Sequence, residues 1–353
     1  MTSPTPIYSA TQFPVFQNRM YDSVASAIEC PKGDITLAED AETGVVCNTS
    51  FRPELMVYDE HYQNEQAVSQ RFRDHLSEVA VLVEDFLGRT NLVEVGCGKG
   101  HFLELLWARG NQATGFDPTY EGDNPGVQKR LFTGGIGITA NGLILRHVLE
   151  HIQGPVDFLR ELKIANQGGG LVYIEVPCFD WIRDHRAWFD IFYEHVNYFR
   201  LSDFDRMFGK VIRSGRCFGG QYLYAIADLA SLRATPLPIS APVAMPADML
   251  QTMHAIAKRD DVSNAVVWGG ASKGVIFALM MSRLGVSIRD IIDINPAKQG
   301  KYVAATGVRV KSPQEVLSTL PTGSTIYIMN SNYSNEIKAM AGLNYNYIGI
   351  DNE

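Results

Sequence analysis

The stretch Leu92–Gly100, LVEVGCGKG, decides the fold of this 353-residue chain, and the helix-like sequence HFLELLWARG follows it. An apolar strand that runs into a glycine turn and then a helix is the opening unit of a nucleotide-binding α/β sheet. Gly96, Gly98 and Gly100 form G-x-G-x-G, whereas a dinucleotide fingerprint has its third glycine one residue later. With Glu94 just before the turn, the tighter spacing favours an adenosyl group without phosphate. A loop that only joins strand to helix is the alternative.

Three later segments continue this alternation of strands and helices. ATGFDPT places Asp117 near the end of a strand, 23 residues after Glu94, where its carboxylate can accept hydrogen bonds from both ribose hydroxyls of a ligand. GLILRHVLEHI supplies a further apolar strand that ends near Arg146–His147, and GLVYIEVP supplies the next. This rhythm is typical of βαβ units and predicts the α/β fold class.

With its motifs in this order, the region Leu92–Asp228 resembles the class I S-adenosylmethionine-dependent methyltransferases. The resemblance implies a seven-stranded Rossmann-like sheet, methyltransferase activity, and S-adenosyl-L-methionine as the cofactor. It also implies cofactor contacts from the glycine turn, from the acid on the next strand and from the turn after the fourth strand. Residues upstream of the glycine turn would close over the methionine end of the cofactor. The cofactor-binding residues implied in this way are Glu94, Gly96, Gly98, Gly100, Asp117, His147, Val148, Tyr62 and Gln63.

A metal-dependent alternative arises from the same segment. His147-Val-Leu-Glu150-His151 fits H-x-x-E-H, the inverted zinc-peptidase motif. That chemistry needs both histidines on one face of a helix and a third ligand. Here the motif follows an apolar strand directly, and Gly154-Pro155 limits any helix. The sequence therefore predicts no metal site, and it predicts structural roles for Glu150 and His151.

A second candidate for chemistry is Asp190–Phe199, DIFYEHVNYF, in which Glu194 stands beside His195. Histidine is the side chain best suited to proton abstraction near neutral pH. On these residues alone, a core histidine that pairs with a backbone carbonyl is the alternative. However, YEHVNYF and the LSDFDRMFG that follows it are similar to the Y-E-H-x-x-Y-[FY] segment of bacterial sugar C-methyltransferases. That family includes enzymes that methylate C-3 of nucleotide-linked 4-keto-deoxysugars.

This second resemblance implies that His195 is a general base. A carbon beside a ketone becomes a nucleophile only after it loses a proton, and the resulting enolate can attack the methyl group of the cofactor. The enzyme must also supply donors near the oxyanion, for which tyrosines are suitable. The catalytic residues implied are His195, Glu194, Tyr193 and Tyr62, and Tyr198 of the same motif is a predicted substrate contact.

The C-terminal region carries a further glycine turn, VVWGGASKG at 266–274, and IIDINPAKQGKY follows it. Gly269, Ala271 and Gly274 form G-x-A-x-x-G, and Asp293 lies 24 residues after the first of them, so NAD is a candidate ligand. The run is also similar to the C-terminal Rossmann-like domain of the same C-methyltransferases. That resemblance implies a substrate-binding domain for a nucleotide-sugar. The predicted phosphate partners, and hence the substrate-binding residues, are Ser272, Lys273 and Lys298.

The predicted organisation has three parts. Residues 1–85 form a short N-terminal cap region, 86–229 the S-adenosylmethionine-binding domain, and 247–353 the C-terminal domain, joined by the proline-rich Ala230–Pro246. Relatives of this kind begin with a zinc module built on two cysteine pairs. Only Cys30 and Cys47 are present here, so no intact zinc module is predicted and the substrate stays open. The same base could yield an O-methyl sugar or act on another polar metabolite.

Composition limits the partners. Apolar residues make up 46% of the chain, which predicts packed cores, and a formal charge of −8 argues against a nucleic-acid partner. No apolar run reaches membrane-spanning length, and the first residues lack a secretory signal pattern. Five scattered cysteines are typical of reduced thiols. We therefore expect a cytoplasmic enzyme with a small-molecule substrate, no membrane partner and an oligomeric state that the sequence leaves open. An NAD-dependent oxidoreductase and a non-catalytic adenosylmethionine sensor are the rival functions.

Overall fold

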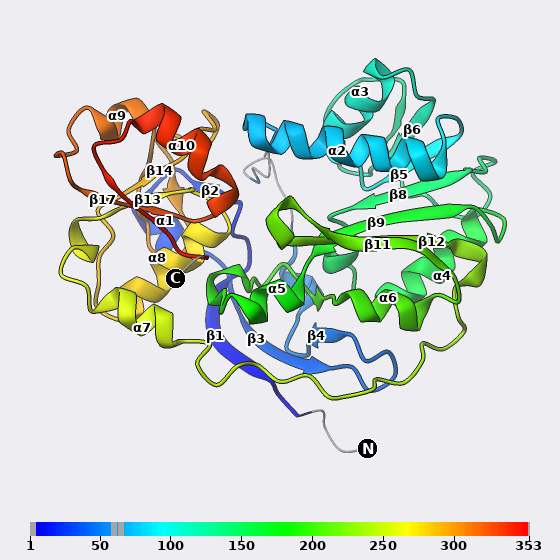
Figure 1. Cartoon of the computed structure of the whole chain (residues 1–353), viewed down its shortest axis with the longest axis horizontal. Helices are drawn as coiled ribbons and strands as arrows, with labels where there is room; N and C mark the ends of the chain where they lie inside the picture. Colours follow the sequence, from blue (N-terminus) through cyan, green and yellow to red (C-terminus); the bar gives the residue numbers. More distant parts are fainter. Residues whose placement is uncertain (1–4, 58–61, 63–66, 352–353) are drawn as a thin grey trace.

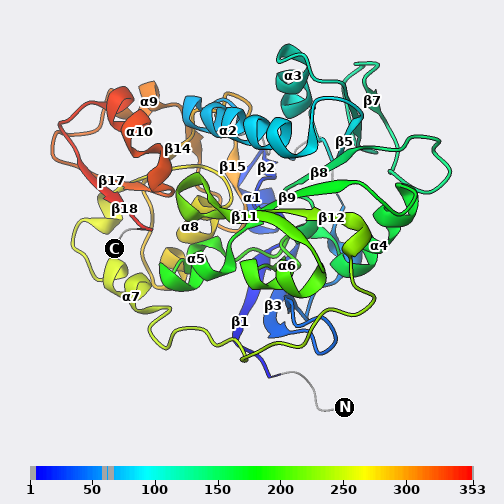
Figure 2. The same ribbon diagram turned by 45° about the vertical axis from the view of Figure 1, so that its right-hand side comes forward.

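The structure is a computed structural model that describes residues 5–57, 62 and 67–351. Two sheets with helices on both faces lie side by side, and a smaller N-terminal sheet lies below them (Figures 1 and 2). The fold class is therefore α/β, as predicted. In the described part of the chain, none of the helices is both long and apolar enough to cross a bilayer.

The first sheet has seven strands in the order β11-β12-β9-β8-β5-β6-β7. The strand β12 is antiparallel to both neighbours, and the other pairs are parallel. The strands are β5 (Leu92–Val95), β6 (Ala113–Phe116), β7 (Val127–Gln128), β8 (Gly142–Arg146), β9 (Leu171–Pro177), β11 (Val211–Cys217) and β12 (Tyr222–Asp228). The strands predicted from Leu92, ATGFDPT, GLILR and GLVYIEVP are all present, because continuous apolar runs suit a sheet buried on both faces.

Helices cover both faces of this sheet (Figure 1). On one face, α2 and α3 pack on Leu92, Ile144 and Tyr173. The other face is covered by α4, α5 and α6. These helices are α2 (Gln70–Leu87), α3 (His101–Ala108), α4 (Pro155–Ala165), α5 (Phe179–Asp184) and α6 (Leu201–Met207). The first of them begins at Gln70, because the Ser69 side chain caps it by accepting from the Phe72 N–H.

The second sheet is fully parallel, with five strands in the order β16-β14-β13-β17-β18. The helices α9 and α10 lie on one face, and α7 and α8 lie on the other (Figure 1). The strands are β13 (Val266–Trp268), β14 (Asp290–Ile292), β16 (Val310–Lys311), β17 (Thr325–Ile328) and β18 (Asn346–Gly349). The helices are α7 (Gln251–Ala257), α8 (Lys273–Arg283), α9 (Pro313–Leu317) and α10 (Ser334–Ala341).

The N-terminal region forms strands that the sequence analysis did not predict. Three of its strands join a four-stranded sheet in the order β1-β3-β4-β10, and the fourth pairs with a strand of the C-terminal region. The four strands are β1 (Tyr8–Pro14), β2 (Met20–Tyr21), β3 (Lys32–Glu39) and β4 (Val46–Asn48). The short helix α1 (Val24–Ile28) lies between β2 and β3, and the helix α2 comes after β4. The partners of the strands are β10 (Asn197–Tyr198) and β15 (Tyr302–Val303). The N-terminal region therefore ties the YEHVNYF segment and the C-terminal region to one body.

Candidate active site

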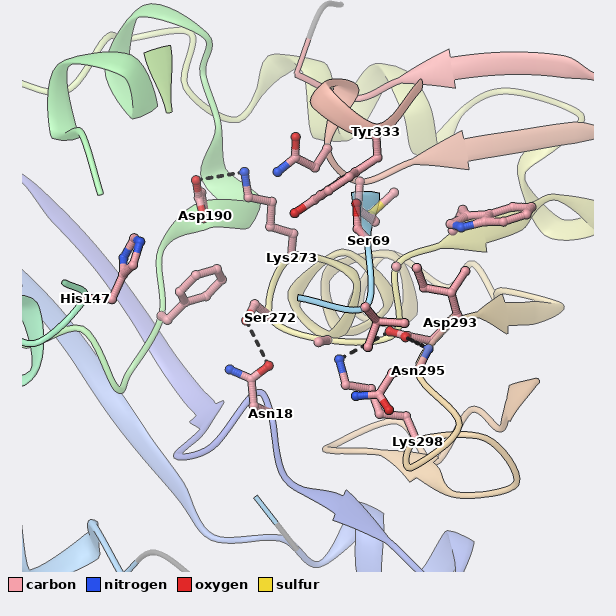
Figure 3. A pocket seen from close by; sticks show the side chains of 18 of the residues that line it. Asn18, Ser69, His147, Asp190, Ser272, Lys273, Asp293, Asn295, Lys298 and Tyr333 are labelled. Atoms are coloured by element: carbon pink, nitrogen blue, oxygen red, sulfur yellow. Dashed lines mark hydrogen bonds and ion pairs between the residues drawn. The ribbon is translucent and has the colours of Figure 1, made fainter. Parts of the chain in front are cut away.

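A cavity of about 240 Å³ lies between the seven-stranded and the five-stranded sheet. Its lining comes from the segments that follow β8, β13, β14 and β17, so the carboxyl ends of strands in both sheets meet there (Figure 3). In α/β proteins this edge is where ligands bind. The cavity also receives Asn18 from the N-terminal region and Tyr333 next to α10. Neither residue carries a sequence signal, because each reaches the site only through tertiary packing.

The first glycine turn has the backbone that the sequence predicts. Gly96 and Gly98 have φ values of 74° and 52°, in the left-handed region that favours glycine. A Cβ on Gly96 would meet Val148 at 2.5 Å, whereas a Cβ on Gly98 would meet nothing within 4 Å. Gly100, with φ 83°, begins α3 as its N-cap. The turn is closed by the Gly98 N–H, which donates to Asp117 Oδ2 at 2.8 Å.

These residues fit an adenosyl group. The open space beside Gly98 is where a side chain would otherwise project. Among the described residues, Asp117 Oδ2 accepts a hydrogen bond from the Gly98 N–H alone, and so it keeps a lone pair for a ribose hydroxyl. Glu94 is 3% exposed, and its Oε2 has no hydrogen-bond partner in the described part of the chain. Burial raises the pKa of Glu94 to about 8, so its neutral carboxyl can donate as well as accept at neutral pH.

His147 connects the glycine turn to the cavity. Its neighbour Val148 packs against Gly96, while His147 itself lines the cavity with φ 53°. The His147 Nδ1 atom lies 3.2 Å from Glu150 Oε1, and Nε2 lies 3.2 Å from Glu175 Oε1. Burial disfavours the charged imidazole, but both carboxylates outweigh it and raise the pKa of His147 to about 9. His147 is therefore charged at neutral pH.

The predicted base His195 lies beside Glu150 and His151. One ligand-type atom from each of the three side chains lies within 4.8 Å of the others, and all three side chains line the cavity. The predicted structural roles of Glu150 and His151 therefore need correction, because both face the site. The sequence did not predict that Glu150 and His151 face a cavity, because the known meaning of H-x-x-E-H is a zinc motif on a helix. The signal was present in the motif itself.

The electrostatics of His195 are unlike those of a free histidine. Burial, and then the neighbouring His151, lower the pKa of His195 to about 3. Its imidazole is therefore neutral at pH 7, and it is a weak proton acceptor on its own. The ring stacks edge-on against His151 and Phe192, with centroid distances of 5.1 and 4.9 Å.

Glu194 and Tyr62 form another wall of the cavity. The Tyr62 hydroxyl donates to Glu194 Oε2 at 2.8 Å, and the Gln17 N–H donates to Oε1 at 2.9 Å. Burial raises the pKa of Glu194. The fold thus brings Tyr62 and Glu194, two predicted catalytic residues 132 positions apart, into direct contact. The predicted cofactor contact Gln63 lies outside the described residues.

Two predicted site tyrosines lie elsewhere. The Tyr193 hydroxyl accepts from the Arg52 N–H at 2.9 Å, and its ring packs at Gly33. The Tyr198 hydroxyl is held by the backbone of Phe192, from whose N–H it accepts and to whose carbonyl it donates. Neither is among the described residues that line the cavity. Both tyrosines therefore make packing contacts and do not face the cavity.

The predicted phosphate partners all line the cavity (Figure 3). Lys273 Nζ lies 3.1 Å from Asp190 Oδ2 and donates to Gln221 Oε1 at 3.0 Å, so it crosses from the second sheet to the first. Ser272 Oγ donates to Asn18 Oδ1 at 3.2 Å. Lys298 Nζ lies 3.4 Å from Asp293 Oδ2. The lysines are thus present at the site, each already paired with an acid.

The second glycine turn repeats the geometry of the first. The Gly270 N–H donates to Asp293 Oδ2 at 3.0 Å, just as the Gly98 N–H donates to Asp117 Oδ2. In the first sheet, Asp117 follows β6 and closes the turn after β5. In the second sheet, Asp293 follows β14 and closes the turn after β13. The two turns are therefore built alike.

The glycine turn gives a prediction with an internal control. We expect Gly96→Ala to destabilise the fold by about 1–3 kcal/mol, because the new Cβ adds overpacking against Val148 to backbone strain. We expect Gly98→Ala to cost about 1 kcal/mol, from strain alone, but to weaken binding of S-adenosylhomocysteine because its methyl group points into the open space. Chemical unfolding and calorimetric titration measure the two effects. Equal binding by Gly98→Ala and the wild type would place the adenosyl group elsewhere.

One comparison with known protein families gives a match over most strands of the first sheet. Residues 62–211 match the protein family described as "Methyltransferase domain". A comparison with curated proteins gives no significant match.

Solved structures that resemble the chain include several methyltransferases. One is the Burkholderia thailandensis 1,6-didemethyltoxoflavin-N1-methyltransferase with bound 1,6-didemethyltoxoflavin and S-adenosylhomocysteine. It is 14% identical over 45% of this chain and 80% of its own, with a TM-score of 0.34. Another is a SAM-dependent methyltransferase from Archaeoglobus fulgidus, which is 16% identical over 46% and 98%, with a TM-score of 0.33. The N-methyltransferase NodS from Bradyrhizobium japonicum WM9 is 12% identical over 45% and 97%, with a TM-score of 0.33.

The family match covers the glycine turn, Asp117, the His147 turn and His195. Residues 62–211, somewhat less than half of the chain, match a methyltransferase domain, and this match supports S-adenosylmethionine-dependent methyltransferase activity.

Proposed function

We propose that this methyltransferase acts on a nucleotide-activated keto-deoxysugar held in the cavity between the two sheets, and that it methylates a carbon beside the ketone. The observation that carries the proposal is the cavity itself. One wall holds Glu150, His151 and His195, and the facing wall holds Ser272, Lys273 and Lys298. A group that activates an acceptor and groups that suit a phosphate therefore share one space.

The donor side rests on the glycine turn. S-adenosylmethionine, when bound, supplies an electrophilic methyl group on a sulfonium. Gly98 and Asp117 suit its adenosyl part, and the turn at His147–Val148 joins that site to the cavity. A donor on the glycine turn and an acceptor in the cavity would then meet at this turn.

The acceptor side needs loss of a proton. We assign this task to the cluster formed by Glu150, His151 and His195, with His195 as its central member. A neutral imidazole is available to assist, although burial keeps the pKa of His195 at about 3, so its neighbours must contribute. Tyr62, on the adjoining wall and oriented by Glu194, is the proposed donor for a developing oxyanion.

The nucleotide side rests on the second sheet. Its five parallel strands and its glycine turn support a second Rossmann-like domain that holds the nucleotide. The amide of Asn295 adds a buried Nδ2 without a hydrogen-bond partner among the described residues, and it lines the cavity. Lys273 and Lys298 would exchange their present acids for phosphate oxygens.

The test begins with the cofactor. We expect calorimetric titration to show micromolar binding of S-adenosylhomocysteine and no binding of NAD. Incubation of the protein with methyl-labelled S-adenosylmethionine and a panel of nucleotide-linked 4-keto sugars should then yield a product whose label lies on carbon. A label on oxygen would move the acceptor to a hydroxyl. Binding of NAD to the second sheet would instead favour an oxidoreductase there.

A further inference from the structure

We propose that Glu150, His151 and His195 together bind a divalent first-row metal cation at the wall of the cavity. Its role at the acceptor rests on the proposed function, but its binding does not. The three ligand-type atoms lie within 4.8 Å of one another, a separation that a single cation can close with small side-chain rotations.

Two buried polar atoms of this cluster have no hydrogen-bond partner among the described residues. Glu150 is 1% exposed, yet its Oε2 has no hydrogen-bond partner among the described residues. The buried Nδ1 of His195 also has none there. A buried carboxylate oxygen left in this way costs free energy unless something binds it, so it is the strongest indication of a cation.

The third ligand is already oriented for metal binding. His151 Nδ1 lies 2.9 Å from the Glu194 carbonyl oxygen, to which only a protonated Nδ1 can donate. That bond fixes the tautomer and leaves the lone pair of Nε2 for a cation. In the same way, His147 Nδ1 contacts Glu150 Oε1 at 3.2 Å and leaves Oε2 as the ligand atom. Hydrogen bonds of this type orient ligands around metal sites.

The backbone holds the ligands at a fixed separation. Glu150 and His151 belong to a short turn, Leu149–His151, just after β8, and His195 precedes β10. The two segments are joined by the Val196 N–H, which donates to the Glu150 carbonyl at 2.8 Å. Asn197 Nδ2 also donates to the Leu149 carbonyl at 3.0 Å. The cluster is therefore prearranged rather than dependent on a mobile loop.

The ligand set indicates the class of metal. Two imidazoles and one carboxylate suit Zn²⁺, Mn²⁺, Co²⁺ or Fe²⁺ better than Ca²⁺, which prefers oxygen alone. Three protein ligands leave positions open, and these would face the cavity because all three side chains line it. A cation here would hold an oxygen of the acceptor and stabilise the negative charge that develops on it as the proton is lost.

A second cluster in the chain does not qualify. His75, Glu175 and Cys217 also place ligand atoms within 4.8 Å of one another. However, Glu175 already accepts hydrogen bonds from Arg146 at 3.1 Å and from Tyr173 at 2.7 Å. None of the three is among the described residues of the cavity lining. That cluster is explained by its own hydrogen bonds.

The test is a titration of the full-length protein with Co²⁺ after dialysis against EDTA. We expect one equivalent to bind and to produce visible d–d absorption bands typical of mixed nitrogen and oxygen coordination. Glu150→Gln and His195→Asn should each weaken Co²⁺ binding at least about tenfold. His185→Asn is the matched control, because His185 stacks on Trp181 and should leave binding unchanged.

Binding of S-adenosylhomocysteine and the thermal unfolding midpoint show whether each variant is folded. The inference is overturned if the folded wild type binds no Co²⁺, or if Glu150→Gln and His195→Asn bind it as tightly as the wild type. Full methyl transfer by the EDTA-treated enzyme would overturn the role of the cation at the acceptor, while the proposed function would stand. Co²⁺ binding without binding of S-adenosylhomocysteine would support the metal site and contradict the proposed function.

Discussion

Replacement of His195 by asparagine should lower methyl transfer at least about 100-fold while it leaves the affinity for S-adenosylhomocysteine within about twofold of the wild type. His195 lines the acceptor cavity beside Glu150 and His151, whereas the glycine turn and Asp117 lie on the other side of the His147 turn. The substitution therefore removes an acceptor-side group and leaves the proposed adenosyl site intact. Turnover is measured with the acceptor that the nucleotide-sugar panel identifies, and affinity by calorimetry.

The matched control is again His185→Asn, which removes an imidazole near Trp181 and should leave turnover unchanged. A His195→Asn enzyme with normal turnover would remove the Glu150–His151–His195 cluster from the chemistry. Such a result would place the catalytic base elsewhere, with no role for this cavity wall in catalysis. Loss of both turnover and cofactor affinity would instead indicate that His195 supports the fold of the whole site.

Local signals explain what the sequence could predict. The run LVEVGCGKG specifies a strand and a glycine turn, and the ten residues after it specify a helix. These local patterns need no information from distant parts of the chain. The same holds for VVWGGASKG and the second sheet. In both cases the acid after the next strand, Asp117 or Asp293, lies near the turn because parallel strands bring their carboxyl ends to one edge.

Distant pairings explain what the sequence could not predict. The strand β4 pairs with β10, about 150 positions later, and β2 pairs with β15, about 280 positions later. The periodicity of apolar residues can predict a strand, but it does not indicate which distant strand will pair with it. The aromatic segment YEHVNYF shows the same limit at the level of side chains. Tyr193 and Tyr198 suit catalysis by residue type, but an irregular backbone turns both of them into packing contacts.

The motif H-x-x-E-H shows how a template can mislead. It was correct to reject a helical zinc-peptidase site, because the structure has a short turn at Leu149–His151 and α4 begins only at Pro155. The same residues nevertheless face the cavity, since the turn directs Glu150 and His151 toward His195. The third member of the cluster comes from a segment more than forty positions away, and only the folded chain reveals it.

Glu175→Gln should destabilise the protein by about 3 kcal/mol or more, which makes it the largest expected effect on stability. Glu175 is fully buried in β9, and Arg146 Nη2 on the neighbouring β8 donates to its Oε1 at 3.1 Å. Burial opposes ionisation of Glu175, but Arg146 and then His147 outweigh it and hold its pKa well below the usual range. Removal of the negative charge leaves the Arg146 guanidinium buried without its counter-charge.

The pH dependence of stability distinguishes this charge effect from a simple packing defect. Glu175 helps to raise the pKa of His147 from 6.5 to about 9. In the wild type, the stabilisation from charged His147 is complete below pH 6.5 and is lost as the pH rises through 9, because the unfolded chain has already released this proton. With glutamine at position 175, the decline in unfolding free energy between pH 6.5 and 9 should be smaller, since the folded-state pKa of His147 falls.

Chemical unfolding across this pH range measures both effects, with Glu54→Gln as the control. Glu54 forms an ion pair with Arg52 at 2.8 Å, but both side chains are more than half exposed, so water already screens the interaction. We expect the control to unfold at the wild-type denaturant concentration and with the wild-type pH profile. A Glu175→Gln protein as stable as the control would show that Arg146 finds another partner. An unchanged pH profile would show that Glu150 alone keeps His147 charged.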